Sequence, residues 1–223
     1  MEIKFSDRIK ECAPGLRVLA YEVEVQNAPT SDSLWEAVEK ETEKIRAQYA
    51  IDEIKNRPAI LATRNAYKAL GKDPNRYRPS AEALCRRVVN GKELYRLTTL
   101  VDFINLLSME TGHSIGGFDA DKIEGDSLLL DAGTKDDIYH GIGRGILNIE
   151  NLPVYRDKVG GIGTPTSDEE RTKLTEETSH LLMLINVYDE TENLEELEKK
   201  TTELLTTLCS PASIRCTPYH CQK

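Results

Sequence analysis

Residues 99–112 read TLVDFINLLSMETG, and this stretch decides the fold. Thr99 and Asp102 have the spacing of a capping box, and Gly112 is a typical helix stop. Apolar side chains surround the segment, while Asp102, Asn105 and Ser108 recur every third residue as its one polar stripe. The pattern predicts a helix that is buried on most of its sides.

Three helices are predicted before this segment. The first covers residues 33–49, where Ser33 and Glu36 suggest a second capping box. The next runs from Pro58 to a stop at Gly71, because proline suits the first helical turn and glycine the C-terminus. A loop follows, and a short helix capped by Ser80 continues through AEALCRRVV.

Strands dominate the remainder of the chain. Residues 17–26 alternate between apolar and polar side chains and predict an early strand. Further strands are expected near Phe118, at 127–130 and at 154–155, and the apolar run 181–188 fits a central strand. A last helix is expected from Leu194 to Leu208. The order predicts a single compact α+β domain over residues 1–208, with a mixed, mostly antiparallel β core flanked by helices and a helix-rich N-terminal half.

The composition is that of a globular protein. The 223 residues are 39% hydrophobic and 30% charged, and no apolar run approaches the roughly 20 residues of a membrane helix. We therefore expect a cytoplasmic protein that does not contact a membrane. Residues 209–223 hold Cys216, His220 and Cys221 but no C-x-x-C pair, so they are interpreted as a loose tail, and neither a metal nor a cofactor is predicted.

The charge is unevenly distributed along the chain. The formal net charge is −9, yet residues 55–96 hold eleven Lys or Arg against three Asp or Glu, and residues 168–203 hold twelve acids against four bases. A basic segment in an acidic chain is a candidate anion-binding surface. The alternative is that these cations pair with acidic groups or face water, and charge alone does not separate the two.

Arg78, Arg86 and Arg87 lie around the helix start at Ser80. Helix N-termini and arginine side chains both suit phosphate, so the three arginines are candidate phosphate ligands. An internal ion pair with the nearby Glu82 is an equally good interpretation.

Asn105 is the sharpest internal signal, because an amide on an apolar helix needs a hydrogen-bond partner. It either ties a loop to the core or lines a pocket, and the residue pattern alone favours the tie. His113 follows the end of the same helix and is a candidate for the same cavity. The segments GIGRG (141–145) and GGIG (160–163) lack the residues of nucleotide-binding motifs and are expected to be turns.

Three segments together resemble one family: YRPSAEALCRR (77–87), LVDFINLLSMETGHSIGGFDADKIEGDSLLLDAG (100–133) and VGGIGTPTSDEERTKLTEETSHLLML (159–184). They are similar to the tRNA-editing domain, modules B-three and B-four, of the bacterial phenylalanyl-tRNA synthetase beta subunit. The resemblance runs from about residue 57 to residue 188. It implies a pocket for an aminoacyl ester, since the editing domain hydrolyses tRNA(Phe) that carries tyrosine.

The resemblance also implies roles for single residues. Asn105 matches the pocket asparagine of the family, and Gly160 and Gly161 match a glycine pair that lets the backbone approach the ligand. Asp102 and Arg171 are further ligand-binding candidates.

Two positions depart from the family pattern. The pocket histidine of the family is expected at Gly116 and its pocket glutamate at Leu184. His113 could replace one of these groups, and so could a side chain of the glycine-rich segment: Asp168, Glu169 or Arg171.

Three functions remain open at this point. The first is a trans-editing deacylase for mischarged aminoacyl-tRNA, with Asn105 and His113 as catalytic candidates. The second is a non-catalytic module that binds RNA or an amino-acid-like ligand, and the third is a protein-interaction domain with a closed pocket. The synthetase's aminoacylation domain is absent, so the chain is not expected to charge tRNA itself. The expected partner is tRNA or aminoacyl-tRNA, not DNA, and the oligomeric state is left open.

Overall fold

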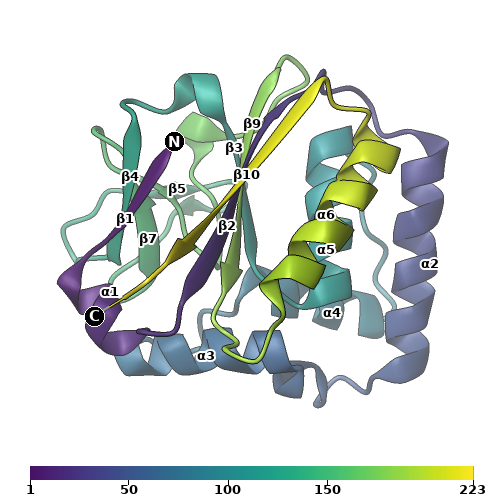
Figure 1. Cartoon of the computed structure of the whole chain (residues 1–223). Coiled ribbons are helices and arrows are strands. Elements are labelled where there is room, and N and C mark those ends of the chain that lie inside the picture. The colour runs from purple at the N-terminus through teal and green to yellow at the C-terminus, as the bar shows by residue number, and fades with distance from the viewer. Residues whose placement is uncertain (223) are drawn as a thin grey trace.

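The computed structural model describes residues 1–222 and has three layers (Figure 1). A four-stranded sheet lies in the middle, with helices on one face and a second four-stranded sheet on the other. This arrangement confirms the predicted α+β class and the mostly antiparallel β core.

The central sheet has the strand order β10-β2-β9-β3 and is antiparallel throughout. Both of its faces are buried, because successive side chains point to opposite sides: Leu19 and Tyr21 face the helices, while Val18 and Ala20 face the second sheet. The predicted central strand is confirmed as β9, which pairs with β2 and β3. The bounds are β2 Arg17–Glu24, β3 Ile115–Asp119, β9 His180–Val187 and β10 Ser213–His220.

The second sheet has the order β1-β4-β7-β8, and only the pairing of β1 with β4 is parallel. Leu128 and Leu130 of β4 pack against Leu182 and Leu184 of β9, so the two sheets share one apolar cluster. The bounds are β1 Glu2–Phe5, β4 Ser127–Ala132, β7 Pro153–Arg156 and β8 Gly161–Gly163, and a small hairpin is formed by β5 His140–Gly141 and β6 Gly145–Ile146.

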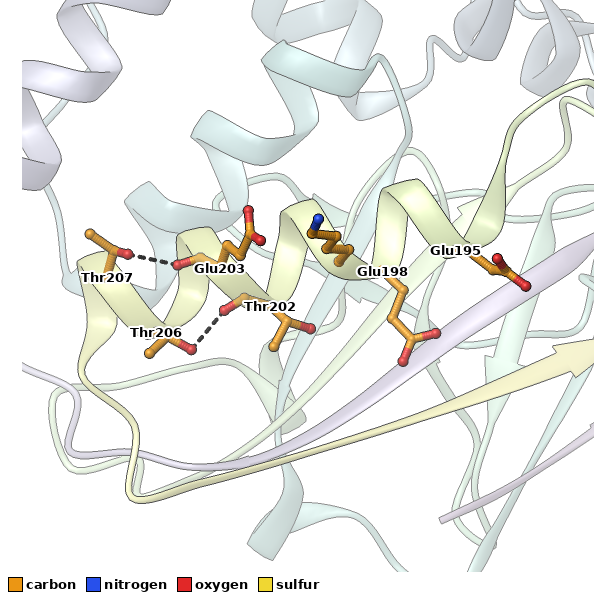
Figure 2. Close-up of a pocket in the computed structure, with 7 residues that line it drawn as sticks. Glu195, Glu198, Thr202, Glu203, Thr206 and Thr207 are labelled. Atoms are coloured by element: carbon orange, nitrogen blue, oxygen red, sulfur yellow. Dashed lines mark hydrogen bonds between the residues drawn. The ribbon is translucent and has the colours of Figure 1, made fainter.

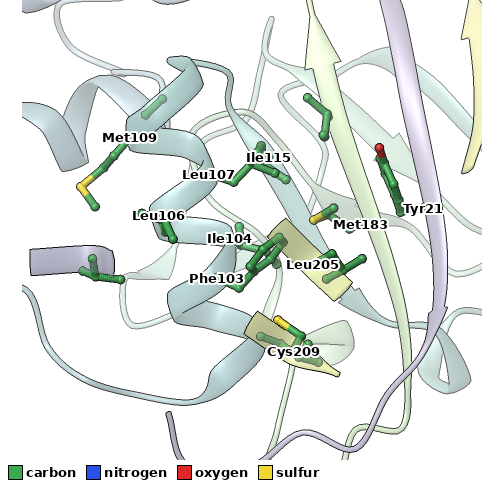
Figure 3. Close-up of a cluster of buried hydrophobic side chains, with 14 of the residues drawn as sticks. Tyr21, Phe103, Ile104, Leu106, Leu107, Met109, Ile115, Met183, Leu205 and Cys209 are labelled. Carbon is green, nitrogen blue, oxygen red and sulfur yellow. The ribbon is translucent and has the colours of Figure 1, made fainter. Parts of the chain in front are cut away.

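The helical layer packs around α5 (Thr99–Thr111), the segment that the sequence singled out. Figure 3 shows Phe103 and Leu107 of α5 in one cluster with Met183 of β9 and Leu205 of α6. The prediction of a helix buried on most sides is confirmed, since nine residues of α5 are buried. The neighbouring helices are α2 Asp32–Gln48, α4 Ser80–Val89 and α6 Leu194–Cys209.

Helix α3 (Pro58–Leu70) crosses one end of the two sheets (Figure 1). It contributes Ile60 to the helical core, Leu70 to the cluster between the sheets and Tyr67 to a third cluster. It therefore ties the layers together. The remaining elements are α1 Asp7–Cys12 and the 3-10 turns Ile54–Asn56, Ala120–Lys122 and Glu170–Thr172.

The predicted helices are confirmed, but their caps are not those expected. Ser31, not Ser33, accepts the capping hydrogen bond of α2 from the N–H of Leu34 at 3.3 Å. Helices α4 and α5 are preceded by Pro79 and Thr98, and neither side chain makes a capping hydrogen bond.

The C-terminal segment differs from the expected loose tail. Residues 213–220 form β10, which pairs along its full length with β2. Its outer edge is free among the described strands, so the missing N–H of Pro218 is tolerated there. The interpretation as a tail was wrong because proline and cysteine residues masked an edge strand.

No helix within residues 1–222 combines the length and apolar character that crossing a membrane requires.

Candidate functional site

A cavity of about 450 Å³ lies between α4, α5 and the edge strand β3. Most of its surface is apolar, and a few polar groups converge on it, which is typical of small-molecule sites. The apolar side chains are Leu84, Leu97, Val101, Ile104, Ile115, Ile142 and Leu174, and the polar residues are Ser80, Thr98, Asn105, Ser108, Asp168 and Lys173.

Asn105 projects from α5 into this cavity. Its side-chain amide makes no hydrogen bond to any of residues 1–222. Asn105 therefore does not tie a loop to the core, and it lines a pocket instead. Ser108 lies one turn further along the same lining. At the start of α5 the buried Oγ1 of Thr98 also lacks a partner among the described residues. This face of α5 therefore offers unused hydrogen-bonding groups to a ligand.

Asp168 reaches the cavity from the loop after β8. Its Oδ2 accepts the N–H of Gly117 at 3.2 Å, on the free edge of β3. The loop is fixed by Thr164, whose Oγ1 accepts the N–H groups of Thr166 and Ser167 at 3.2 and 3.1 Å. Burial raises the pKa of the Asp168 carboxyl to about 7, although the side chain keeps some exposure toward the cavity.

Asp102 and His113 lie outside the cavity lining. The Oδ2 of Asp102 accepts hydrogen bonds from the Thr30 hydroxyl and from the N–H of Leu97, so Asp102 fixes two loops to the start of α5. His113 is buried, and its Nε2 lies 3.1 Å from Glu192 Oε2. That hydrogen bond lowers the pKa of Glu192, and it holds the histidine away from Asn105.

Gly160, Gly161 and Arg171 also lie away from the cavity, around Asp157. The Asp157 carboxylate accepts the N–H of Gly160 at 3.0 Å and two hydrogen bonds at 2.9 Å from the Arg171 guanidinium. A Cβ at Gly161 would approach the ring of Tyr139 to 3.0 Å. These residues shape the β7–β8 turn and do not face Asn105.

The three candidate phosphate ligands differ in whether their side chains already have hydrogen-bond partners within the protein. The Nε of Arg86 donates to the buried Glu82 at 2.8 Å, and the Nε of Arg87 donates to the carbonyl of Glu93 at 2.8 Å. Arg78 is exposed and forms no ion pair with residues 1–222, and it lies two positions before Ser80 at the cavity. Of the three arginines, only Arg78 therefore has a side chain without a hydrogen-bond partner in residues 1–222.

Much of the basic segment 55–96 is used internally. Arg57 and Arg64 are buried, and Arg64 donates to Glu82 at 2.7 Å. Lys72 donates to the carbonyls of Asn148 and Glu150 at 3.0 and 2.7 Å. The internal interpretation thus holds for these cations, and the anion-binding surface is smaller than the charge count suggests.

The two positions that depart from the family pattern are neighbours in space. Gly116 of β3 pairs directly with Leu184 of β9. Leu184 is fully buried, and a Cβ at Gly116 would lie 2.7 Å from the ring of Phe118. Apolar packing therefore occupies the place where the family histidine and glutamate were expected.

We expect the Gly116→Ala variant to lose about 1–3 kcal/mol of its free energy of unfolding, because the added methyl group collides with Phe118 in a packed core. Gly160→Ala is the matched control, since a Cβ there has no atom within 4 Å. Urea unfolding of both variants measures the difference. Equal stability of the two would contradict the close packing at Gly116.

A second hollow runs along the exposed side of α6 (Figure 2). Two of its hydroxyl groups are occupied, because Thr206 and Thr207 donate to the carbonyls of Thr202 and Glu203 at 2.7 and 2.8 Å. The other polar groups are mainly glutamates that point into solvent, so this open groove has no converging set of groups like that around Asn105 and Asp168.

Comparison with known proteins gives three findings. No curated protein sequence matches the chain. Among solved structures, an N-terminal fragment of the phenylalanyl-tRNA synthetase beta subunit from Pyrococcus horikoshii is similar, with 15% identity and a TM-score of 0.49. The alignment covers 96% of this chain and 50% of that chain, so this chain spans about half the length of the fragment.

The third finding comes from family models. Residues 62–207 match the model of the B3/4 domain, and this stretch contains the cavity residues from Ser80 to Leu174. The match covers more than half of the sequence and confirms the resemblance drawn from the three sequence segments. The chain belongs to the B3/4 domain family.

Proposed function

We propose that the cavity binds the aminoacyl end of a mischarged aminoacyl-tRNA and that the chain hydrolyses the ester bond in trans. The observation that carries the proposal is that Asn105 and Asp168, which are far apart in sequence, line one largely apolar cavity. An apolar pocket with few polar groups suits an amino-acid side chain joined to a polar ester. Membership of the B3/4 family supports the same substrate class.

The reaction needs one water molecule and no redox step. Water attacks the ester carbonyl carbon, the bond from this carbon to the ribose oxygen breaks, and a proton passes from the water to that oxygen. The Asn105 amide is free to donate a hydrogen bond to the carbonyl oxygen, where negative charge develops in the transition state. The neighbouring ribose hydroxyl of the tRNA is suited to relay the proton.

The tRNA would be held by a small number of cations. Arg78 is the best-placed phosphate ligand, because Arg86 and Arg87 already have internal partners. Few phosphate contacts imply transient binding with a shallow dependence on salt.

Deacylation assays at low salt test the proposal. We expect the purified chain to hydrolyse tyrosyl-tRNA(Phe) or another member of a panel of mischarged tRNAs. The Asn105→Ala variant is expected to lose about 100-fold in rate, the usual effect of removing one donor to a developing oxyanion. Asn65→Ala, at an exposed position of α3, is the matched control and should keep full activity. Absence of turnover on every tRNA would reject the hydrolase.

A second candidate function is a binding module without turnover. The apolar pair Gly116 and Leu184 favours it, since neither position supplies the polar group expected from the family. Such a module would be stabilised thermally by an amino-acid-like ligand, with little effect of salt. Stabilisation without deacylation would identify this function.

A further inference from the structure

We infer that Asp168 is the receptor for the α-ammonium group of the ligand, so that the cavity accepts aminoacyl groups with a free amine and excludes those with an acylated nitrogen. The inference rests on the proposed function only in that both take this cavity as the ligand site. It adds a substrate class that the resemblance does not supply.

Asp168 has no counter-ion among residues 1–222. Oδ2 of Asp168 accepts one hydrogen bond, from the N–H of Gly117, and Oδ1 accepts none from residues 1–222. No Lys, Arg, His or N-terminal amine within those residues lies at ion-pair distance from this carboxylate. A carboxylate among apolar groups is costly unless a cation pairs with it. A ligand ammonium group would supply that cation.

The basic side chains nearest to Asp168 have acidic partners of their own. Lys173 also lines the cavity, but its Nζ is paired with Glu170 at 2.6 Å. The Nδ1 of His140 lies 3.8 Å from Oε1 of Glu169, the residue next to Asp168. Both side chains therefore contact a carboxylate other than Asp168.

Two further groups complete the surroundings of Asp168. The Tyr139 hydroxyl donates to the carbonyl of Ser167 at 2.7 Å, and burial raises the pKa of Tyr139, with a smaller contribution from the charge of Asp168. Arg144 is exposed on the turn of the β5–β6 hairpin and forms no ion pair with residues 1–222. Arg144 does not line the cavity, and of the two charged lining residues, Asp168 and Lys173, only Asp168 lacks an ion pair within residues 1–222.

The cavity lining offers a different kind of group to each substituent of an aminoacyl α-carbon. Val101, Ile104 and Leu174 offer an apolar surface for an amino-acid side chain, and Asn105 offers an amide for the carbonyl group. Asp168 is then left for the third substituent of the α-carbon, the amine. Acylation of that amine removes its charge and adds bulk, so both attraction and fit are lost.

Calorimetric titration of the full chain with phenylalaninamide and leucinamide, beside their N-acetyl derivatives, tests the inference. We expect at least one free amide to bind at least tenfold more tightly than its N-acetyl derivative. The preference should disappear in Asp168→Asn and return in part in Asp168→Glu. Thermal melting of each variant verifies that it is folded.

The pH dependence gives an independent readout. Affinity should peak between about pH 7 and 8. It falls at lower pH as Asp168 gains a proton, and at higher pH as the α-amino group, with a pKa of about 7.7–8.0, loses its own. A monotonic profile would contradict the ion pair.

Three results would overturn the inference: equal affinity for free and acetylated amides, a preference retained in Asp168→Asn, or no binding of either free amide. Failure of the hydrolase is distinguishable from each of them. Preferential binding of free amines without deacylation would support the inference and reject the hydrolase. Equal deacylation of aminoacyl-tRNA and N-acetyl-aminoacyl-tRNA would support the hydrolase and reject the inference.

Discussion

Replacement of Glu82 by glutamine is expected to lower the free energy of unfolding by about 3 kcal/mol, the range for breaking a buried ion pair from one side. Glu82 is fully buried on α4, and its carboxylate accepts hydrogen bonds from Arg64 at 2.7 Å and from Arg86 at 2.8 Å. The amide cannot balance both guanidinium groups. Arg64 suffers most, since its side chain is only 7% exposed.

Urea unfolding at pH 7 measures the effect. Glu36→Gln on the exposed face of α2 is the matched control and should change stability by less than about 0.5 kcal/mol. A stability of Glu82→Gln equal to that of the control would show that the arginine pair does not depend on this carboxylate.

Replacement of Asp168 by asparagine is expected to raise the free energy of unfolding, whereas Glu82→Gln lowers it. The carboxyl has a pKa of about 7 in the folded chain against about 3.9 when unfolded, so its stabilising contribution is complete below pH 4 and is lost as the pH rises through 7. Above pH 7 the folded chain carries an unpaired carboxylate in an apolar cavity. Asparagine removes that charge and should raise the free energy of unfolding by about 2 kcal/mol at pH 8, after allowance for the partial exposure of the side chain.

Thermal melts of the wild type and Asp168→Asn at pH 4, 6 and 8 measure this difference. The gain should be near zero at pH 4 and largest at pH 8, while Asp136→Asn at an exposed position should show no trend. A gain independent of pH would contradict the raised pKa. Residues retained at a cost in stability are common at functional sites.

The helical layer could be predicted from sequence because its signals are local. Helix α5 has apolar side chains around its circumference and a glycine stop at Gly112, and both features operate within a few turns. The strands β1 and β10 lack such signals, since β10 alternates between exposed and half-buried side chains at a sheet edge. Their pairing depends on residues far away in sequence.

The site was predictable in part for the same reason. Asn105 stands out on an apolar helix, but the residue pattern alone favoured a structural tie, and only the family resemblance indicated a pocket. Asp168 was only one of several side chains considered in the glycine-rich segment, because its position depends on how the loop after β8 meets the edge of β3. His113 lies close to Asn105 in sequence, yet the turn at Gly112 directs it to Glu192.

The position of β2 in the sheet has a consequence for synthesis. The strand ends at residue 24, but both of its neighbours, β9 and β10, come from residues 180–220. A ribosome therefore extends the chain by more than 150 residues before β2 has any partner. Throughout that interval the apolar side chains of β2, which are buried on both faces of the finished sheet, lack the strands that pair with β2. Nascent or prematurely terminated chains should aggregate through residues 17–24, and chaperones that bind extended apolar segments should recognise this strand first.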